Sequence, residues 1–125
     1  MNSNIPKNTE KYYWTNHVTR KMQYYQLSES RVKRIIKSPK RKELGVAPNT
    51  IAVMQPSKRK LTKRAEKSNH ASEVWAMYQL IKRKNKEARI KIITAWRYPG
   101  KSPIRGPIPV PPEILEELGE IKINR

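Results

Sequence analysis

The residues with the clearest chemistry lie in one predicted strand, residues 89–98. Its basic residues occupy alternate positions: Arg89, Lys91 and Arg97. Because a strand repeats every two residues, they are expected on one face of a sheet. The positions between them are mainly apolar and are expected to face a core: Ile90, Ile92, Thr94 and Trp96. Tyr98 adds a phenol at the strand's end. Fixed cations beside a core suit a phosphate-bearing partner better than a small apolar ligand.

Two other segments carry candidate groups for such a partner. On the predicted first helix these are His17, Arg20 and Lys21. The second segment is a basic connector over residues 57–71, with Lys58, Arg59, Lys60, Lys63 and Arg64 as its candidate contacts. A run of this kind is either a solvated loop or an electrostatic arm for a nucleic-acid backbone.

The overall charge favours a polyanionic partner. The chain has 125 residues, enough for one domain, and its 28 Lys and Arg against 10 Asp and Glu give a net charge of +18. A charge this high repels itself, and nucleic acid is the usual polyanion that relieves the repulsion. The alternative is a protein kept in solution by its charge. A membrane partner is disfavoured, because the sequence has no long apolar run.

Composition argues against several other chemistries. The chain contains no Cys, and its only two histidines, His17 and His70, lie far apart in sequence. Disulfides, thiolate metal sites and a metal or cofactor site are therefore not expected. The N-terminus has no apolar stretch of the kind that signal peptides carry, so a cytoplasmic protein is expected.

Two helices are predicted, and the first of them carries His17, Arg20 and Lys21. Apolar residues about four apart predict a helix from Thr15, with Thr15 or Asn16 as its cap: Trp14, Val18, Met22 and Tyr25. Ser28 is expected to cap a second helix that ends at Ser38-Pro39, because the residue before proline disfavours helix. Together they predict an αα-hairpin, with Arg31, Lys33, Arg34 and Lys37 facing solvent.

Strands are predicted for residues 41–44, 50–54, 73–82 and 88–98, the last two joined by a charged turn. The fold class is therefore α+β, with the αα-hairpin packed on a small antiparallel sheet. Residues 1–10 are expected to be a flexible N-terminus and 11–101 the domain, with 57–71 as its basic loop. Residues 102–125 form a proline-rich arm and a short helix.

The short helix, residues 112–118, has the reverse charge of the rest of the chain. Residues 102–125 carry three basic and four acidic groups. The apolar residues Ile114, Leu115 and Leu118 predict that this helix docks on the sheet. We expect Glu113, Glu116 and Glu117 then to cover part of the basic face.

The order of these motifs resembles a known family. Thr15-x-His17 with Met22, then Leu27-Ser28 with Val32 and Ile35-Ile36, is similar to the opening of BrnT-like domains. The segment Ile92-Ile93-Thr94-Ala95-Trp96-Arg97 resembles their last strand. The likeness spans residues 12–98, and the 57–71 insertion and the proline-rich tail depart from the family pattern.

The resemblance implies a RelE-type fold and a ribonuclease-toxin-like function on RNA, including ribosome-bound mRNA, with a cognate antitoxin as a further partner. RNA cleavage needs phosphate-binding cations and groups that transfer protons. Arg97 is then the candidate for the phosphate, and His17 and Tyr98 are the candidates for proton transfer. The alternatives are a non-catalytic RNA- or ribosome-binding protein and, with less support, a DNA-binding regulator.

Overall fold

A five-stranded sheet forms the centre of the fold in the computed structural model, which describes residues 5–61 and 70–121. The strands lie in the order β1-β5-β4-β3-β2. Their bounds are β1 Tyr12–Trp14, β2 Arg41–Leu44, β3 Ile51–Ser57, β4 Ser72–Arg83 and β5 Lys86–Pro99. The helices are α1 Asn16–Tyr25, α2 Glu29–Lys37 and α3 Pro112–Glu117, and α3 continues into a 3₁₀ turn, Leu118–Glu120. The predicted α+β class is confirmed.

The sheet is mixed rather than antiparallel. Strands β2 to β5 pair antiparallel, but β1 runs parallel to β5, with Tyr12 opposite Ile90 and Trp14 opposite Ile92. The prediction of an antiparallel sheet holds for four of the strands and is wrong at this edge. Strand β1 can pair in parallel with β5 because the connection between these two strands is long. It contains α1, α2 and three strands.

The first two helices begin where the sequence predicts. The Oγ of Thr15 accepts a hydrogen bond from the Val18 amide, and the Oγ of Ser28 accepts one from the Arg31 amide. These bonds satisfy donors that a helix leaves free at its first turn. Thr15 also donates to the carbonyls of Ile92 and Ile93, at 2.9 and 3.0 Å. The cap of α1 thus fixes this helix to β5.

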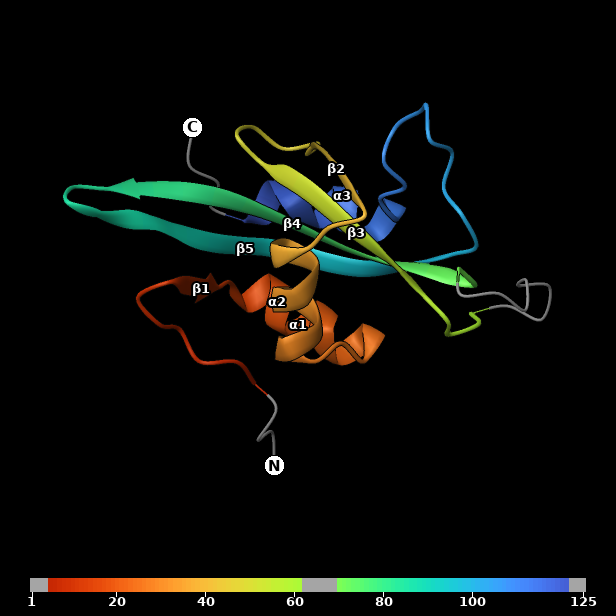
Figure 1. Cartoon of the computed structure of the whole chain (residues 1–125), viewed down its shortest axis with the longest axis horizontal. Helices are drawn as coiled ribbons and strands as arrows, with labels where there is room; N and C mark the ends of the chain where they lie inside the picture. The colour runs from red at the N-terminus through yellow and green to blue at the C-terminus, as the bar shows by residue number, and fades with distance from the viewer. Residues whose placement is uncertain (1–4, 62–69, 122–125) are drawn as a thin grey trace.

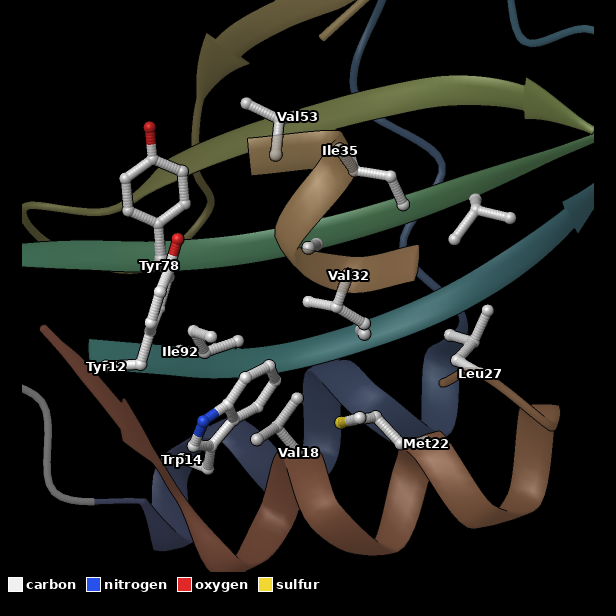
Figure 2. Packing of buried hydrophobic residues seen from close by; sticks show 13 residues of the cluster. Tyr12, Trp14, Val18, Met22, Leu27, Val32, Ile35, Val53, Tyr78 and Ile92 are labelled. Carbon is white, nitrogen blue, oxygen red and sulfur yellow. The ribbon is translucent and has the colours of Figure 1, made fainter. Parts of the chain in front are cut away.

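Helices cover both faces of the sheet (Figure 1). On one face, α1 and α2 bury Val18, Met22, Val32 and Ile35 against apolar residues of the strands. Figure 2 shows these side chains directed from the two helices toward the strands. The predicted stripe is confirmed in α1 at Val18 and Met22, which are almost completely buried. Trp14 is buried as well, but it is the last residue of β1 and not part of the helix.

On the opposite face, α3 covers a pair of tryptophans. The rings of Trp75 and Trp96 stack with centroids 5.8 Å apart, and Ile114 and Leu118 pack in the same buried cluster. The predicted docking of the short helix on the sheet is confirmed. The predicted stripe is wrong at Leu115, whose side chain is 49% exposed, because the helix contacts the sheet through Ile114 and Leu118, four residues apart.

A bulge in β5 changes which residues share a face. Met77 lies opposite Thr94 and Tyr78 opposite Ile92, so Ile93 is an extra residue in β5. As a result Ile92 and Ala95 belong to the core under α1 and α2, whereas Ile93 and Trp96 belong to the core under α3. The prediction that Ile92 and Trp96 share a face is therefore wrong, because strict alternation ends at the bulge.

Strands β4 and β5 form a long hairpin that extends beyond the helices (Figure 1). Its turn contains Asn85 with a positive φ of 61°, a conformation that Asn tolerates better than most residues.

In the described part of the chain, no helix has the length and apolar character needed to cross a membrane.

Candidate functional site

Arg97, the centre of the predicted phosphate site, lies beside the C-terminal end of α1. Its Nε donates to the carbonyl of Tyr25 at 2.7 Å, and its Nη2 donates to the carbonyl of Gln26 at 3.2 Å. Gln26 has a left-handed backbone (φ 56°) that ends the helix. Arg97 therefore satisfies carbonyls that a helix leaves free at its end. The guanidinium group is half-buried and held in place by neutral acceptors.

Arg31, in the first turn of α2, is held in the same manner. Its Nη1 donates to the side chain of Gln55 at 2.8 Å, and its Nη2 donates to the carbonyl of Pro56 at 3.0 Å. Gln55 is itself fixed, because its amide donates to the Ser38 carbonyl at 2.7 Å. A second guanidinium group is thus anchored by neutral groups alone.

These two side chains line a groove between the α1–α2 junction and the end of β3. We call it the basic groove, and it has a volume of about 540 Å³. Its lining residues are Gln26, Ser28, Arg31, Arg34, Pro56, Ser57, Lys58, Arg59 and Arg97. Five of the nine are basic, and none of the described lining residues is acidic.

The cations of the basic groove act on one another. Burial and the neighbouring Arg34 lower the pKa of Arg31. Burial, then Arg59 and Arg31, lower the pKa of Arg97. An arginine pKa starts so high that both groups stay charged at neutral pH. Burial is the larger cause for both groups, and the neighbouring cations add to it because like charges disfavour the charged form.

The described ion pairs all lie outside the basic groove. They join Glu10 to Arg83 and Lys86, Glu29 to Lys33, Glu43 to Arg41, Glu73 to His70, and Glu117 to Lys21 and His17. Within residues 5–61 and 70–121, none involves a groove cation. A concave surface with unbalanced cations is the electrostatic form of an anion-binding site.

The structure divides the predicted site residues among several places. Arg97, Lys58 and Arg59 come together in the basic groove, and Lys60 is exposed just beyond it. Lys63 and Arg64 lie outside the described residues. His17, Arg20 and Lys91 line a different cleft, where Lys21 pairs with Glu117 at 2.7 Å.

The three predicted catalytic residues do not converge. Arg97 contacts the carbonyl of Tyr25, eight residues after His17, which is about 12 Å along the helix axis. Tyr98 packs against the tryptophan core on the other face of the sheet. Burial lowers the pKa of His17, partly opposed by Glu117 and the backbone of Ile93, so its ring is mainly neutral at pH 7.

The predicted basic face of β5 is also divided. Lys91 lies in the cleft beside α3, whereas Arg97 contacts α1, and the bulge at Ile93 separates them. Arg89 donates to the Thr9 carbonyl at 3.1 Å and lies over the ring of Tyr13. The prediction that the three cations share one face is wrong, because the extra residue shifts the alternation between them.

The prediction of site residues missed Arg31 and Arg34. Their spacing of three on the polar side of α2 was a usable signal, since such residues share a helix face. Nothing local indicates that this face meets Arg97, which is 63 positions after Arg34 in the chain. That meeting depends on where β5 lies relative to both helices.

Comparisons with known proteins identify no relative. No family model, no curated protein and no solved structure matches the chain. Within the described ranges, no three His or Glu side chains are grouped to hold a metal ion.

Proposed function

We propose that the protein binds RNA through the sugar-phosphate backbone, with phosphates in the basic groove. The observation that carries the proposal is the convergence of five cations in one concavity without a described carboxylate. Arg31 and Arg97 are already held by carbonyl groups, so a phosphate meets donors whose positions are fixed before binding. Arg34, Lys58 and Arg59 are exposed around them and extend the positive surface.

Single-stranded RNA fits the basic groove better than a duplex. A positively charged groove can follow one flexible backbone, whereas a rigid duplex requires a broad surface or an element that enters a groove. Helix α2 has nine residues and packs on the sheet through Val32 and Ile35. The resemblance to BrnT-like domains gives separate support for RNA over DNA.

Binding without cleavage is the form of the proposal that the geometry supports best. The described groove residues include no His, Tyr or carboxylate that exchanges protons near neutral pH. His17 and Tyr98 lie at other places in the fold. The same assay tests for a ribonuclease, because a labelled RNA reports both binding and cleavage.

The test measures the affinity of the full chain for a labelled single-stranded RNA of about 20 nucleotides by fluorescence anisotropy. Arg34→Gln removes one groove cation whose side chain makes no described hydrogen bond, and Lys37→Gln removes a cation of the same helix outside the groove. We expect Arg34→Gln to weaken binding about three- to tenfold and Lys37→Gln to have a much smaller effect.

Two further samples complete the experiment. Single-stranded and duplex DNA of matched sequence should bind more weakly than the RNA. Gel analysis of the RNA after incubation should show intact strands. Equal loss of affinity in Arg34→Gln and Lys37→Gln would contradict the assignment to the basic groove, and cleavage abolished by His17→Ala would favour the ribonuclease instead.

A further inference from the structure

A second polar cleft lies at the N-terminal half of α1, where this helix meets α3 and β5. It has a volume of about 300 Å³ and is separate from the basic groove. Its lining residues are Tyr13, Thr15, Asn16, His17, Arg20, Lys91, Glu117, Glu120 and Ile121. We call it the α3 cleft.

His17 is the unusual residue of the α3 cleft. It is only 4% exposed, and its Nε2 has no hydrogen-bond partner among the described residues. A buried polar atom without a partner is costly, and native structures contain few of them. Glu117 Oε2 lies 3.6 Å from this nitrogen, which is too far for a hydrogen bond but directs an anionic oxygen toward it.

Lys21 and Arg20 act on the same carboxylate and lower its pKa. Lys21 Nζ contacts the other oxygen of Glu117 at 2.7 Å, and Arg20 and Lys91 line the cleft beside it. Lys91 also lies over the ring of Tyr13, at 6.0 Å from its centre. Glu120 is the other acidic residue of the lining. The Glu117 carboxylate thus lies between the Lys21 ammonium group and the His17 imidazole, inside a cleft that Arg20 and Lys91 also line.

We propose that the α3 cleft is a second phosphate-binding site and that Glu117 is its internal occupant. A phosphate ester offers the same oxygen acceptors as a carboxylate, with more charge and a third oxygen. When Glu117 turns away, phosphate oxygens accept from Lys21 and from the His17 ring, which carries one N–H even when neutral. Helix α3 then acts as a competitor for the ligand.

This inference does not depend on the basic groove. The two sites lie at different ends of α1 and share no lining residue. Arg34→Gln, which changes the groove alone, should leave phosphate binding in the α3 cleft unchanged. A failure of one proposal is therefore distinguishable from a failure of the other.

The experiment follows the His17 ring of the full chain by NMR while inorganic phosphate, and then adenosine monophosphate, is added. Glu117→Gln removes the internal anion and keeps the shape of the side chain. Glu116→Gln is the matched control, because it makes the same change at the next position of α3, where the side chain is exposed and has no described ion pair.

We expect Glu117→Gln to bind phosphate at least about threefold more tightly than both the wild type and Glu116→Gln, with a shift of the His17 ring signals. Tighter binding of adenosine monophosphate than of phosphate assigns the site to nucleotides, and equal binding assigns it to the free anion. Arg20→Gln in the Glu117→Gln background should weaken binding again. Unmoved His17 signals, or equal affinities of Glu117→Gln and Glu116→Gln, would overturn the proposal.

Discussion

At the scale of single residues, fixed hydrogen bonds decide which charged groups are available. Arg97 and Arg31 are bonded to carbonyl or amide oxygens and keep their full positive charge for a ligand. Lys21 is neutralised by Glu117 at 2.7 Å. Sequence gives the same formal charge to all three residues. Their capacity to bind an anion differs because their partners differ.

Glu73 shows how a buried carboxylate serves the fold. It is 1% exposed and accepts hydrogen bonds from the Trp75 indole and the Ser102 amide, both at 3.0 Å, and lies 2.8 Å from His70 Nε2. Burial alone raises the pKa of Glu73, but hydrogen bonds from Ser102, Trp75 and His70 outweigh it and lower the pKa below its usual value. The carboxylate thus ties the start of the proline-rich arm to β4.

A prediction about pH follows from this lowered pKa. A group whose folded pKa is below its unfolded value stabilises the protein above the unfolded pKa of about 4.5. That stabilisation is lost as the pH falls through the folded pKa. We expect Glu73→Gln to reduce the free energy of unfolding at pH 7 by about 1–3 kcal/mol, because the Ser102 amide loses a charged acceptor.

Urea unfolding at pH 7 and at about pH 3 measures this effect. The destabilisation by Glu73→Gln should become smaller as the pH is lowered from 7 toward 3, because the stabilisation from the charged carboxylate declines as the pH approaches the lowered folded pKa. Glu87→Gln is the control, because Glu87 is exposed and makes no described side-chain ion pair. An equal loss of unfolding free energy at both pH values would show that the destabilisation does not come from the charge of Glu73.

At the scale of elements, each helix contributes different residues to the two candidate sites and the core. Helix α1 connects the two candidate sites, since its N-terminal half borders the α3 cleft and its C-terminal end borders the basic groove. Helix α2 supplies Arg31 and Arg34. Helix α3 completes the tryptophan core through Ile114 and Leu118 and brings Glu117 to the α3 cleft. A deletion of residues 103–125 would therefore expose a core as well as a site.

The contact of α3 with the sheet gives a matched pair of variants. Ile114 is completely buried beside the tryptophans, whereas its neighbour Leu115 is half exposed. We expect Ile114→Ala to lower the free energy of unfolding by about 2–5 kcal/mol, because it leaves a cavity in the core. Leu115→Ala should change it by less than about 1 kcal/mol. Thermal or urea unfolding measures both, and similar losses would show that α3 docks through a different face.

At the scale of the whole molecule, anion binding depends less on the net charge of +18 than on where positive charge is left without a paired carboxylate. Glu10 pairs with Arg83 of the β4–β5 hairpin, Glu29 pairs with Lys33 on the surface of α2, and Glu117 of α3 pairs with Lys21 of α1. The basic groove has no such partner in the described chain. RNA affinity should therefore depend on the release of counterions from a small, localised number of phosphates.

The salt dependence of RNA affinity measures how many phosphates the basic groove neutralises. For single strands, each neutralised phosphate contributes about −0.7 to the slope of log K against log salt, so five groove cations give about −3.5. Affinity should then fall about 10²-fold between 50 and 200 mM salt, and Arg34→Gln should make the slope shallower by about 0.7. Anisotropy titrations at four salt concentrations test this. A slope near zero would exclude phosphate contacts as the basis of binding.

The local elements can be predicted from the sequence alone. Helix caps at Thr15 and Ser28, the apolar stripe of α1 and the apolar β4 were readable because each depends on residues within one turn or one strand. The docking of α3 was also predictable from its apolar residues, although Leu115 was placed on the wrong side. The basic composition indicated an anionic partner without indicating where it binds.

The two candidate sites arise from the way distant segments pack together, and no local pattern predicts them. The parallel pairing of β1 with β5 and the bulge at Ile93 arise from contacts between distant strands, and no short sequence pattern contains that information. The bulge moves Arg97 toward α1, where it meets Arg31 and Arg34, and leaves Lys91 beside His17 and Glu117. The side chains were visible in the sequence, but their grouping depends on the register between strands, because one extra residue exchanges the two faces of a sheet.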